Sequence, residues 1–173
     1  DDGDDDKNQN VTFYVTVETG SSLFATSPTI TPEGLISYRP VVDANGTAVI
    51  SVYLQDDGST SHYGDDNRSD SQTCTMTIQA VNDPPSFTAG DHQVIDNKAG
   101  AQTVENWAVN LSAGPSDESG QTLTFIVSND HNDLFIAQPE IDSSGTLRYS
   151  PNPNLGGIAT VTVILKDNGG IMN

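Results

Sequence analysis

The sequence has one cysteine and few basic residues. A single cysteine excludes an internal disulfide. Six Lys and Arg stand against 24 Asp and Glu, a formal net charge of −18. This balance argues against nucleic acid or an anionic membrane surface as a partner, because both require a basic face. The sequence also has no signal peptide, apolar membrane-spanning run or lipidation motif, so we expect no membrane insertion.

Catalytic motifs are missing as well. The sequence contains no nucleophile elbow, phosphate loop, zinc-ligand spacing or nucleotide fingerprint. The three histidines, His62, His92 and His131, lie in polar loops and show no metal-binding spacing. Paired carboxylates such as Asp56-Asp57 could suggest glycoside hydrolysis. Because such acids recur with an internal repeat, described below, we predict that the chain is not an enzyme.

Residues that favour helices are sparse, and apolar residues alternate with polar ones instead. The alternation is clearest over residues 11–17, 48–54, 74–80 and 161–165. Each run is typical of a strand with one buried and one solvated face, and Gly, Asn, Asp and Pro separate the runs. The pattern predicts an all-β protein of sandwich type. Cys74 falls on the apolar side of its run, where we expect a small buried residue.

The two halves of the chain resemble each other. Residues 24–58 align without a gap on residues 135–169 at a shift of 111, with twelve identities that include Phe24/Phe135, Tyr38/Tyr149 and Asp56/Asp167. A shift of 112 pairs Asp5 with Asp117 and Phe13 with Phe125. This period is the size of one immunoglobulin-like sandwich, and tandem arrays of such units are common in long surface proteins.

The stretch Val-Asn-Asp-Pro-Pro, residues 81–85, falls between the two repeats. Two prolines in a row restrict the backbone and make an extended connector, and Asn82 and Asp83 place oxygen ligands on it. We predict domains at 1–82 and 83–173. By the repeat register the first lacks a counterpart of residues 83–114 and the second lacks a strand matching residues 73–81. The chain therefore reads as an excerpt whose missing strands come from neighbouring segments or subunits.

These motifs resemble cadherin-like repeats. The run from "LQDDG" (54–58) to "VNDPP" is similar to the end of such a repeat, "TVENW" (103–107) to the motif that carries a calcium-ligating Glu, and "SDESGQTLTF" (116–125) to the acidic loop before the third strand. "SGTLRYSPNPNLGG" is closest to the bacterial branch of the family. The resemblance implies tandem Greek-key sandwiches, each immunoglobulin-like in architecture.

The resemblance also implies calcium as a cofactor. It assigns Asn82 and Asp83 of the linker, Asp117 and Glu118 of one loop and Asp167 of another to the junction. Three further acids would serve the preceding junction and one the next: Asp5, Asp6 and Asp56, and Glu105. Calcium takes six to eight oxygen ligands from separate segments, which suits this set. The Leu-Asp-Arg-Glu motif of animal cadherins has no counterpart, so fewer ions are expected.

Other features are less specific. Asp2, Asp4 and Asp6 are spaced like the start of an EF-hand, but Phe13 stands where the loop needs Glu, which excludes that motif. Four glycosylation sequons occur, at Asn10, Asn45, Asn67 and Asn110, about as many as chance gives. We expect the cores to contain Phe13, Val15, Ile50, Val52, Met76 and Ile78 in the first repeat and Phe125, Val127, Leu147, Val161 and Val163 in the second.

Three functions remain open from the sequence. The first is an extracellular stalk, adhesin or fibre segment at the cell surface, with adjacent repeats as partners and calcium stiffening the joint. The second is a subunit of a polymeric filament, completed by strands from neighbours. The third is a module that recognises glycans or a protein, which few aromatics and no cluster of Trp and Tyr support. We expect Trp107 to be a core residue and not a sugar platform.

Overall fold

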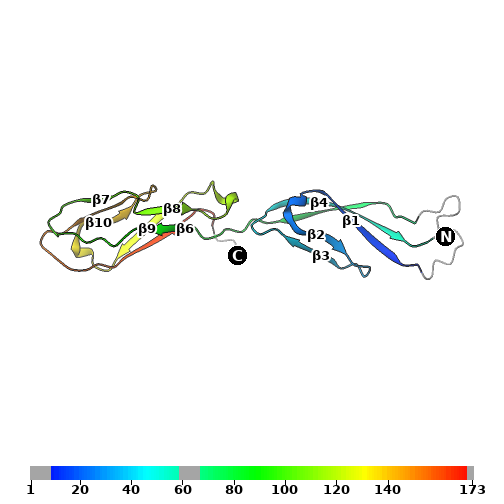
Figure 1. The fold of residues 1–173 in the computed structure, drawn as a ribbon, viewed down its shortest axis with the longest axis horizontal. Helices are drawn as coiled ribbons and strands as arrows, with labels where there is room; N and C mark the ends of the chain where they lie inside the picture. The colour runs from blue at the N-terminus through cyan, green and yellow to red at the C-terminus, as the bar shows by residue number, and fades with distance from the viewer. Residues whose placement is uncertain (1–8, 59–66, 171–173) are drawn as a thin grey trace. The chain divides into compact units, whose positions relative to one another are not determined.

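The structure is a computed structural model that describes residues 9–58 and 67–170. It confirms the all-β prediction: in the described residues the only helical segments are short 3-10 turns (Figure 1). No helix there is long and apolar enough to cross a membrane. The chain divides into two compact units, which meet in sequence between Ala80 and Val81.

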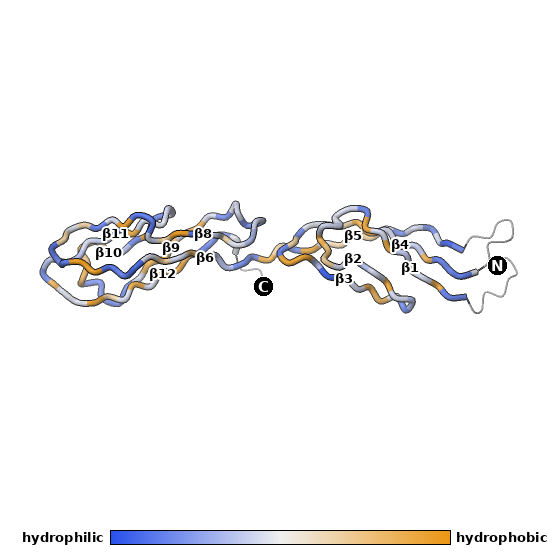
Figure 2. Tube along the Cα trace, viewed as in Figure 1, coloured by the Kyte–Doolittle hydropathy of each residue, from blue (hydrophilic) through white to orange (hydrophobic). Residues whose placement is uncertain are grey.

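The described residues of the first unit form five strands. They are β1 (Val11–Thr19), β2 (Phe24–Ile30), β3 (Ile36–Pro40), β4 (Gly46–Asp56) and β5 (Gln72–Ile78), with a 3-10 turn η2 (Ser21–Leu23) before β2. One antiparallel sheet has the order β1-β4-β5 and the other pairs β2 with β3. The alternating runs predicted from the sequence are therefore strands, and their alternation is visible along the chain trace (Figure 2).

The core of the first unit centres on β4. Ala48 and Ile50 are fully buried, and Phe24 of β2 is also buried. The ring of Phe24 meets that of Tyr38 edge-to-face, with centroids 5.9 Å apart. Such a contact adds to the stabilisation from apolar burial and holds β2 against β3.

Seven strands form in residues 81–170, the described part of the second unit. They are β6 (Ser86–Ala89), β7 (Gln102–Val104), β8 (Ala108–Ser112), β9 (Thr124–Asn129), β10 (Phe135–Ile141), β11 (Leu147–Pro151) and β12 (Val161–Lys166). The 3-10 turns η3 (Ser116–Glu118) and η4 (Asn132–Leu134) precede β9 and β10. The sheets have the orders β10-β11-β7, β12-β9 and β6-β8. Ala108, Ile141, Leu147 and Tyr149 form the buried core.

The internal repeat is visible in the strand pairing. β2 pairs with β3 through Phe24↔Pro40, Thr26↔Arg39, Thr29↔Ser37 and Ile30↔Ile36. β10 pairs with β11 through the residues 111 positions later, with the same two irregularities. Phe135 and Tyr149 also repeat the edge-to-face contact of Phe24 and Tyr38, at 6.2 Å. The sequence identities thus mark equivalent positions in two similar folds.

The two units differ in which strands have neighbours. β11 pairs with β10 and β7, whereas its equivalent β3 pairs with β2 alone among the strands that the structure describes. Tyr149 is accordingly 7 % exposed and Tyr38 is 44 % exposed. The difference in exposure follows from this difference in pairing, because β7 covers Tyr149 on one side.

Two residues predicted to be buried are not. Cys74 lies exposed on β5, the edge strand of its sheet, and Val161 is 37 % exposed on β12. Alternation determines which side chains share a face of a strand, but another layer must cover that face before they are buried. The remaining predicted core residues are at least partly buried, with Ile50 and Leu147 the most enclosed.

We predict that Ile50→Ala destabilises the first unit by about 2–5 kcal/mol, because it leaves a cavity under a fully buried side chain. Urea denaturation followed by circular dichroism measures this. Val42→Ala, at a position 77 % exposed, is the control and should change the free energy of unfolding by less than about 0.5 kcal/mol. Equal effects of the two changes would show that β4 does not organise the core.

An ion pair lies at one end of the β9–β12 sheet. The side-chain oxygen Oδ1 of Asp130 is 2.9 Å from Nδ1 of His131 and accepts the backbone N–H of Thr160 at 2.7 Å. The hydrogen bond to His131, with that from Thr160, lowers the pKa of Asp130 to about 2. The same contact raises the pKa of His131 above its ordinary value. Through its bonds with Thr160, Asp130 therefore joins the end of β9 to the start of β12.

We predict that Asp130→Asn lowers the pKa of His131, as measured by NMR titration of the ring protons. Because the pKa of His131 is raised on folding, its stabilisation is complete below its unfolded pKa, about 6.5. It is lost as the pH rises through the folded value. Asp130 stabilises the fold above its unfolded pKa of about 3.9 and loses this effect as the pH falls towards 2. An unchanged His131 pKa in the variant would contradict the contact.

Candidate functional site

The linker residues Asn82 and Asp83 are held by two loops of the second unit. The backbone N–H of Asp83 donates to Oε1 of Glu118 at 2.8 Å. Nδ2 of Asn82 donates to Oδ1 of Asp167 at 3.2 Å, and its Oδ1 accepts from Nε2 of Gln121 at 2.9 Å. Four of the predicted ligand residues, Asn82, Asp83, Glu118 and Asp167, therefore come together, and Gln121 joins them. We call these five residues the linker cluster.

The turn after β12 fixes the position of Asp167. Its Oδ1 accepts the backbone N–H of Gly169 at 3.0 Å, while Oδ1 of Asn168 accepts that of Thr122 at 2.8 Å. These bonds tie the turn to the loop that leads into β9. A Cβ atom on Gly169 would clash with Oδ1 of Asn82. Glycine at this position therefore lets the linker side chain approach the turn.

Glu118 is buried at the end of η3. It is only 6 % exposed, and its Oε1 accepts the Asp83 amide. Gly114 makes room for the carboxylate: its φ is +153°, which favours glycine, and a Cβ there would clash with Oε2 of Glu118. The loop around η3 thus places a carboxylate against the linker backbone.

Two buried oxygen atoms of the linker cluster have no hydrogen-bond donor. They are Oε2 of Glu118 and Oε1 of Gln121. Leaving a buried acceptor unpaired costs about 1–3 kcal/mol, and more for a charged group. Both atoms are acceptors, so another acceptor cannot satisfy them. A cation or a water molecule would, and oxygen atoms of this kind are the ligands that calcium prefers.

Several predicted ligands do not join the linker cluster. Glu105 is exposed in the turn between β7 and β8, and Asp117 is exposed on η3. Asp5 and Asp6 lie outside the described residues. Among residues 9–58 and 67–170, no group of three His, Cys, Asp or Glu side chains could by itself hold a metal ion. Any cation here would thus depend on amide or backbone oxygens as well as carboxylates.

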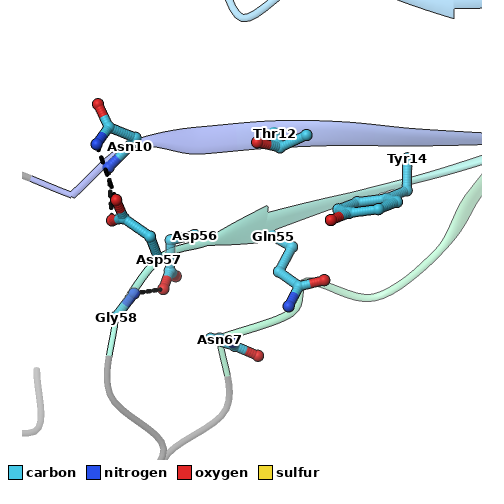
Figure 3. A pocket seen from close by; sticks show the side chains of 8 residues that line it. All are labelled: Asn10, Thr12, Tyr14, Gln55, Asp56, Asp57, Gly58 and Asn67. Atoms are coloured by element: carbon cyan, nitrogen blue, oxygen red, sulfur yellow. Dashed lines mark hydrogen bonds between the residues drawn. The ribbon is translucent and has the colours of Figure 1, made fainter.

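Asp56 lies in an equivalent turn of the first unit. Its Oδ1 accepts the N–H of Gly58 at 2.8 Å, and Asp57 accepts the N–H and side-chain amide of Asn10, each at 2.8 Å (Figure 3). The two bonds from Asn10 lower the pKa of Asp57. The Gly58–Asp56 bond corresponds to the Gly169–Asp167 bond of the second unit, and the bond from the Asn10 N–H to Asp57 corresponds to that from the Thr122 N–H to Asn168. The repeat therefore reproduces this turn in both units.

A polar pocket of about 420 Å³ opens beside this turn (Figure 3). It is lined by Asn10, Thr12, Tyr14, Gln55, Asp56, Asp57, Gly58 and Asn67. The ring of Tyr14 stacks on that of Tyr53 at 4.9 Å, and the guanidinium of Arg68 lies over Tyr53. The lining offers amides, carboxylates and one aromatic ring, but no nucleophile paired with a base.

Two sequons are engaged in hydrogen bonds. The Asn10 amide donates to Asp57, and Nδ2 of Asn110, a residue with φ +54°, donates to Oγ1 of Thr88 at 3.3 Å. Trp107 packs against the core of the second unit and donates from its ring nitrogen to the Asp91 carbonyl at 3.1 Å. This supports the prediction of a core residue over a sugar platform.

The roles of Gln121, Gly114 and Gly169 at the linker were not predicted from the sequence. Two of these have a signal in the repeat: Gln121 matches Gln9 at a shift of 112, and Gly169 matches Gly58 at 111. The Gln9 amide also lies close to the Gly58 backbone, as that of Gln121 does to Gly169. Repetition of an amide next to the same turn could have identified it.

The all-β fold is that of an immunoglobulin-like β-sandwich. Residues 82–173, more than half of the chain, match the bacterial Ig domain family, and the chain belongs to that family. A comparison with curated proteins finds no match. Bacterial Ig domains are typically non-enzymatic structural modules and commonly occur in extracellular surface proteins. This match confirms the immunoglobulin-like part of the family resemblance found in the sequence. All five residues of the linker cluster lie within the matched range.

We predict that Gly114→Ala disrupts the linker cluster and lowers the stability of the second unit by about 1–3 kcal/mol, through strain at positive φ and displacement of Glu118. The backbone N–H of Asp83 should exchange faster with solvent, which NMR measures. Gly120→Ala is the matched control in the same loop, since a Cβ there meets nothing within 4 Å. If both variants retain slow exchange at Asp83, Glu118 does not hold the linker.

Proposed function

We propose that the chain is a spacer segment of a bacterial cell-surface protein, in which tandem cadherin-like Ig sandwiches follow one another and calcium stiffens the linker. The domain family, the internal repeat and the proline-restricted linker support the spacer role. Such a segment holds another part of its protein away from the surface, as in a stalk, adhesin or fibre. Its partners are adjacent repeats.

The observation that carries the calcium proposal is the pair of buried acceptors beside the linker, Oε2 of Glu118 and Oε1 of Gln121. A cation bound there would draw on Glu118 and Gln121, with Asp167, Asn82 and the linker backbone nearby. These are oxygen ligands from three segments, as calcium sites require. The residues therefore fit the ion, although they supply only two carboxylates in direct contact with the linker.

Calcium would act on the linker through charge. Glu118 and Asp167 both approach the linker residues, and the chain carries a net charge of −18. Without a cation, carboxylates that share a small volume repel each other and the buried one remains desolvated. Neutralising them would strengthen the attachment of Asn82 and Asp83 to the second unit. A linker fixed at one end in this way bends less freely.

Glycan recognition is a second candidate, favoured by the polar pocket of the first unit. Its amides and carboxylates are groups that hydrogen-bond sugar hydroxyls, and Tyr14, 43 % exposed, offers part of an aromatic surface. Binding on a carbohydrate array that is lost in Tyr14→Ala would support this candidate. Equal binding by both proteins would exclude the pocket as the sugar site.

We predict that calcium raises the melting temperature of the second unit relative to a chelator. Binding to the folded state alone adds about 2.7 kcal/mol when free calcium is a hundredfold above the dissociation constant. Glu118→Gln keeps the shape of the side chain and an acceptor for Asp83 but removes the charge, so it should lose most of the shift. Scanning calorimetry of the full chain measures both.

Asp91→Asn is the charge-matched control, because Asp91 is exposed in the same unit and is not one of the five linker-cluster residues. It should respond to calcium as the original chain does. Magnesium, which demands a smaller octahedral site, should stabilise less. If calcium shifts no transition, or shifts the Glu118→Gln variant equally, the linker cluster is a hydrogen-bonded structural joint with no ion.

A further inference from the structure

The turn after β12 contains an asparagine followed by a glycine. Residues 167–170 have the sequence Asp-Asn-Gly-Gly, and Asn168, Gly169 and Gly170 are exposed. The backbone nitrogen of the residue that follows an asparagine can attack the side-chain amide and displace ammonia. Glycine obstructs this attack least, because it has no side chain. The turn therefore supplies both reactants of a deamidation, and solvent water reaches them.

Hydrogen bonds hold both reactants. The N–H of Gly169 donates to Oδ1 of Asp167 at 3.0 Å, so a carboxylate lies against the nitrogen that would attack. The side-chain oxygen of Asn168 accepts the backbone N–H of Thr122 at 2.8 Å. A donor at this oxygen stabilises the negative charge that the oxygen gains when the amide carbon is attacked. A carboxylate that accepts the attacking N–H is within reach of its proton.

We propose that Asn168 is a site of spontaneous deamidation, promoted by the Asp167 carboxylate and the Thr122 N–H. The Gly169 nitrogen bonds to Cγ of Asn168 and passes its proton to the carboxylate of Asp167. The Cγ–Nδ2 bond then breaks, and Nδ2 leaves as ammonia with that proton. The product is a cyclic imide, which water opens at either of its carbonyls to give aspartate or isoaspartate.

The first unit shows that a carboxylate fits this position of the turn. At a shift of 111, Asn168 corresponds to Asp57. Asp57 accepts the backbone N–H of Asn10 at 2.8 Å, as Asn168 accepts that of Thr122. An aspartate formed from Asn168 would keep the Thr122 bond and reproduce the Asp-Asp-Gly turn of the first unit.

The isoaspartate product would instead disturb the linker. Its backbone runs through the side-chain carboxyl group, which inserts one methylene before Gly169. Gly169 lies so close to Asn82 that even a Cβ atom on it would clash with Oδ1 of Asn82. Oδ1 of Asp167 also accepts Nδ2 of Asn82, at 3.2 Å. Displacing Gly169 would therefore weaken the attachment of the linker, whereas the aspartate product retains it.

A second Asn-Gly pair, Asn45-Gly46, provides an internal comparison. Asn45 is half-buried, and Gly46 is the first residue of β4, opposite Ile78 of β5. A glycine held in a strand ladder has less freedom to approach the side chain before it. Asn45 should therefore react more slowly than Asn168 while the chain is folded.

The test incubates the full chain at neutral pH with a chelator, so that no cation occupies Asp167. Peptide mass spectrometry follows each asparagine and separates aspartate from isoaspartate. We expect Asn168 to convert faster than Asn45 by at least about tenfold, a barrier difference of about 1.4 kcal/mol. Retention of the Asn168 amide, or equal conversion of Asn45, would overturn the proposal.

Two variants examine the chemistry and the product. Asp167→Asn keeps an acceptor for the Gly169 N–H but no longer takes its proton, so conversion of Asn168 should slow by at least about tenfold. The rate at Asn45 should not change. Asn168→Asp, which reproduces one product, should melt at the same temperature as the original chain.

A synthetic peptide of residues 164–170 measures the reaction without the fold, and so decides the matter even if Asp167→Asn unfolds the second unit. The folded chain should convert Asn168 faster than the peptide does, because only the fold brings the Thr122 N–H to the amide oxygen. Equal or slower conversion in the folded chain would show that the turn protects the amide and would overturn the proposal.

Discussion

Every backbone or side-chain polar group that leaves water has to find a partner, and this requirement governs both units. The strands meet it by pairing, so β4, bonded on both sides, carries the most buried residues of the first unit. The linker meets it through side chains: the Asp83 N–H is satisfied by Glu118. At Oε2 of Glu118 the requirement is unmet within the described residues, and we propose that a bound cation meets it.

The repeat connects these observations. Asp56 and Asp167 occupy the same turn, bonded in the same way, one beside a polar pocket and one beside the linker. This turn is thus part of the fold of each unit. Its aspartate stabilises the turn by accepting the N–H of the glycine two residues later, whether or not an ion binds. In the second unit, Asn82 and Asp83 lie next to this turn, together with a buried Glu118.

Strand positions could be predicted from the sequence because they depend on local alternation of apolar and polar residues. The repeat could be predicted because its identities align without a gap. That Asn82, Asp83, Glu118 and Asp167 come together was suggested by the linker motif and the acidic loops of the second repeat, while their role as ligands stays a prediction. Gln121 could not be predicted, since an amide in a loop has no signature of its own. The exposure of Cys74 and Val161 was also missed, because alternation defines a face of a strand, whereas the neighbours that cover it are set by long-range pairing.

The central claim is that the unpaired oxygens at the linker hold calcium. A crystal structure of the chain grown with calcium, with anomalous scattering to identify the ion, tests it most directly. The account predicts an anomalous peak within about 2.3–2.6 Å of Oε2 of Glu118, with further oxygens from Gln121, Asp167 or the linker completing the shell. A water molecule at that position, or an empty site with Glu118 turned towards solvent, would contradict it.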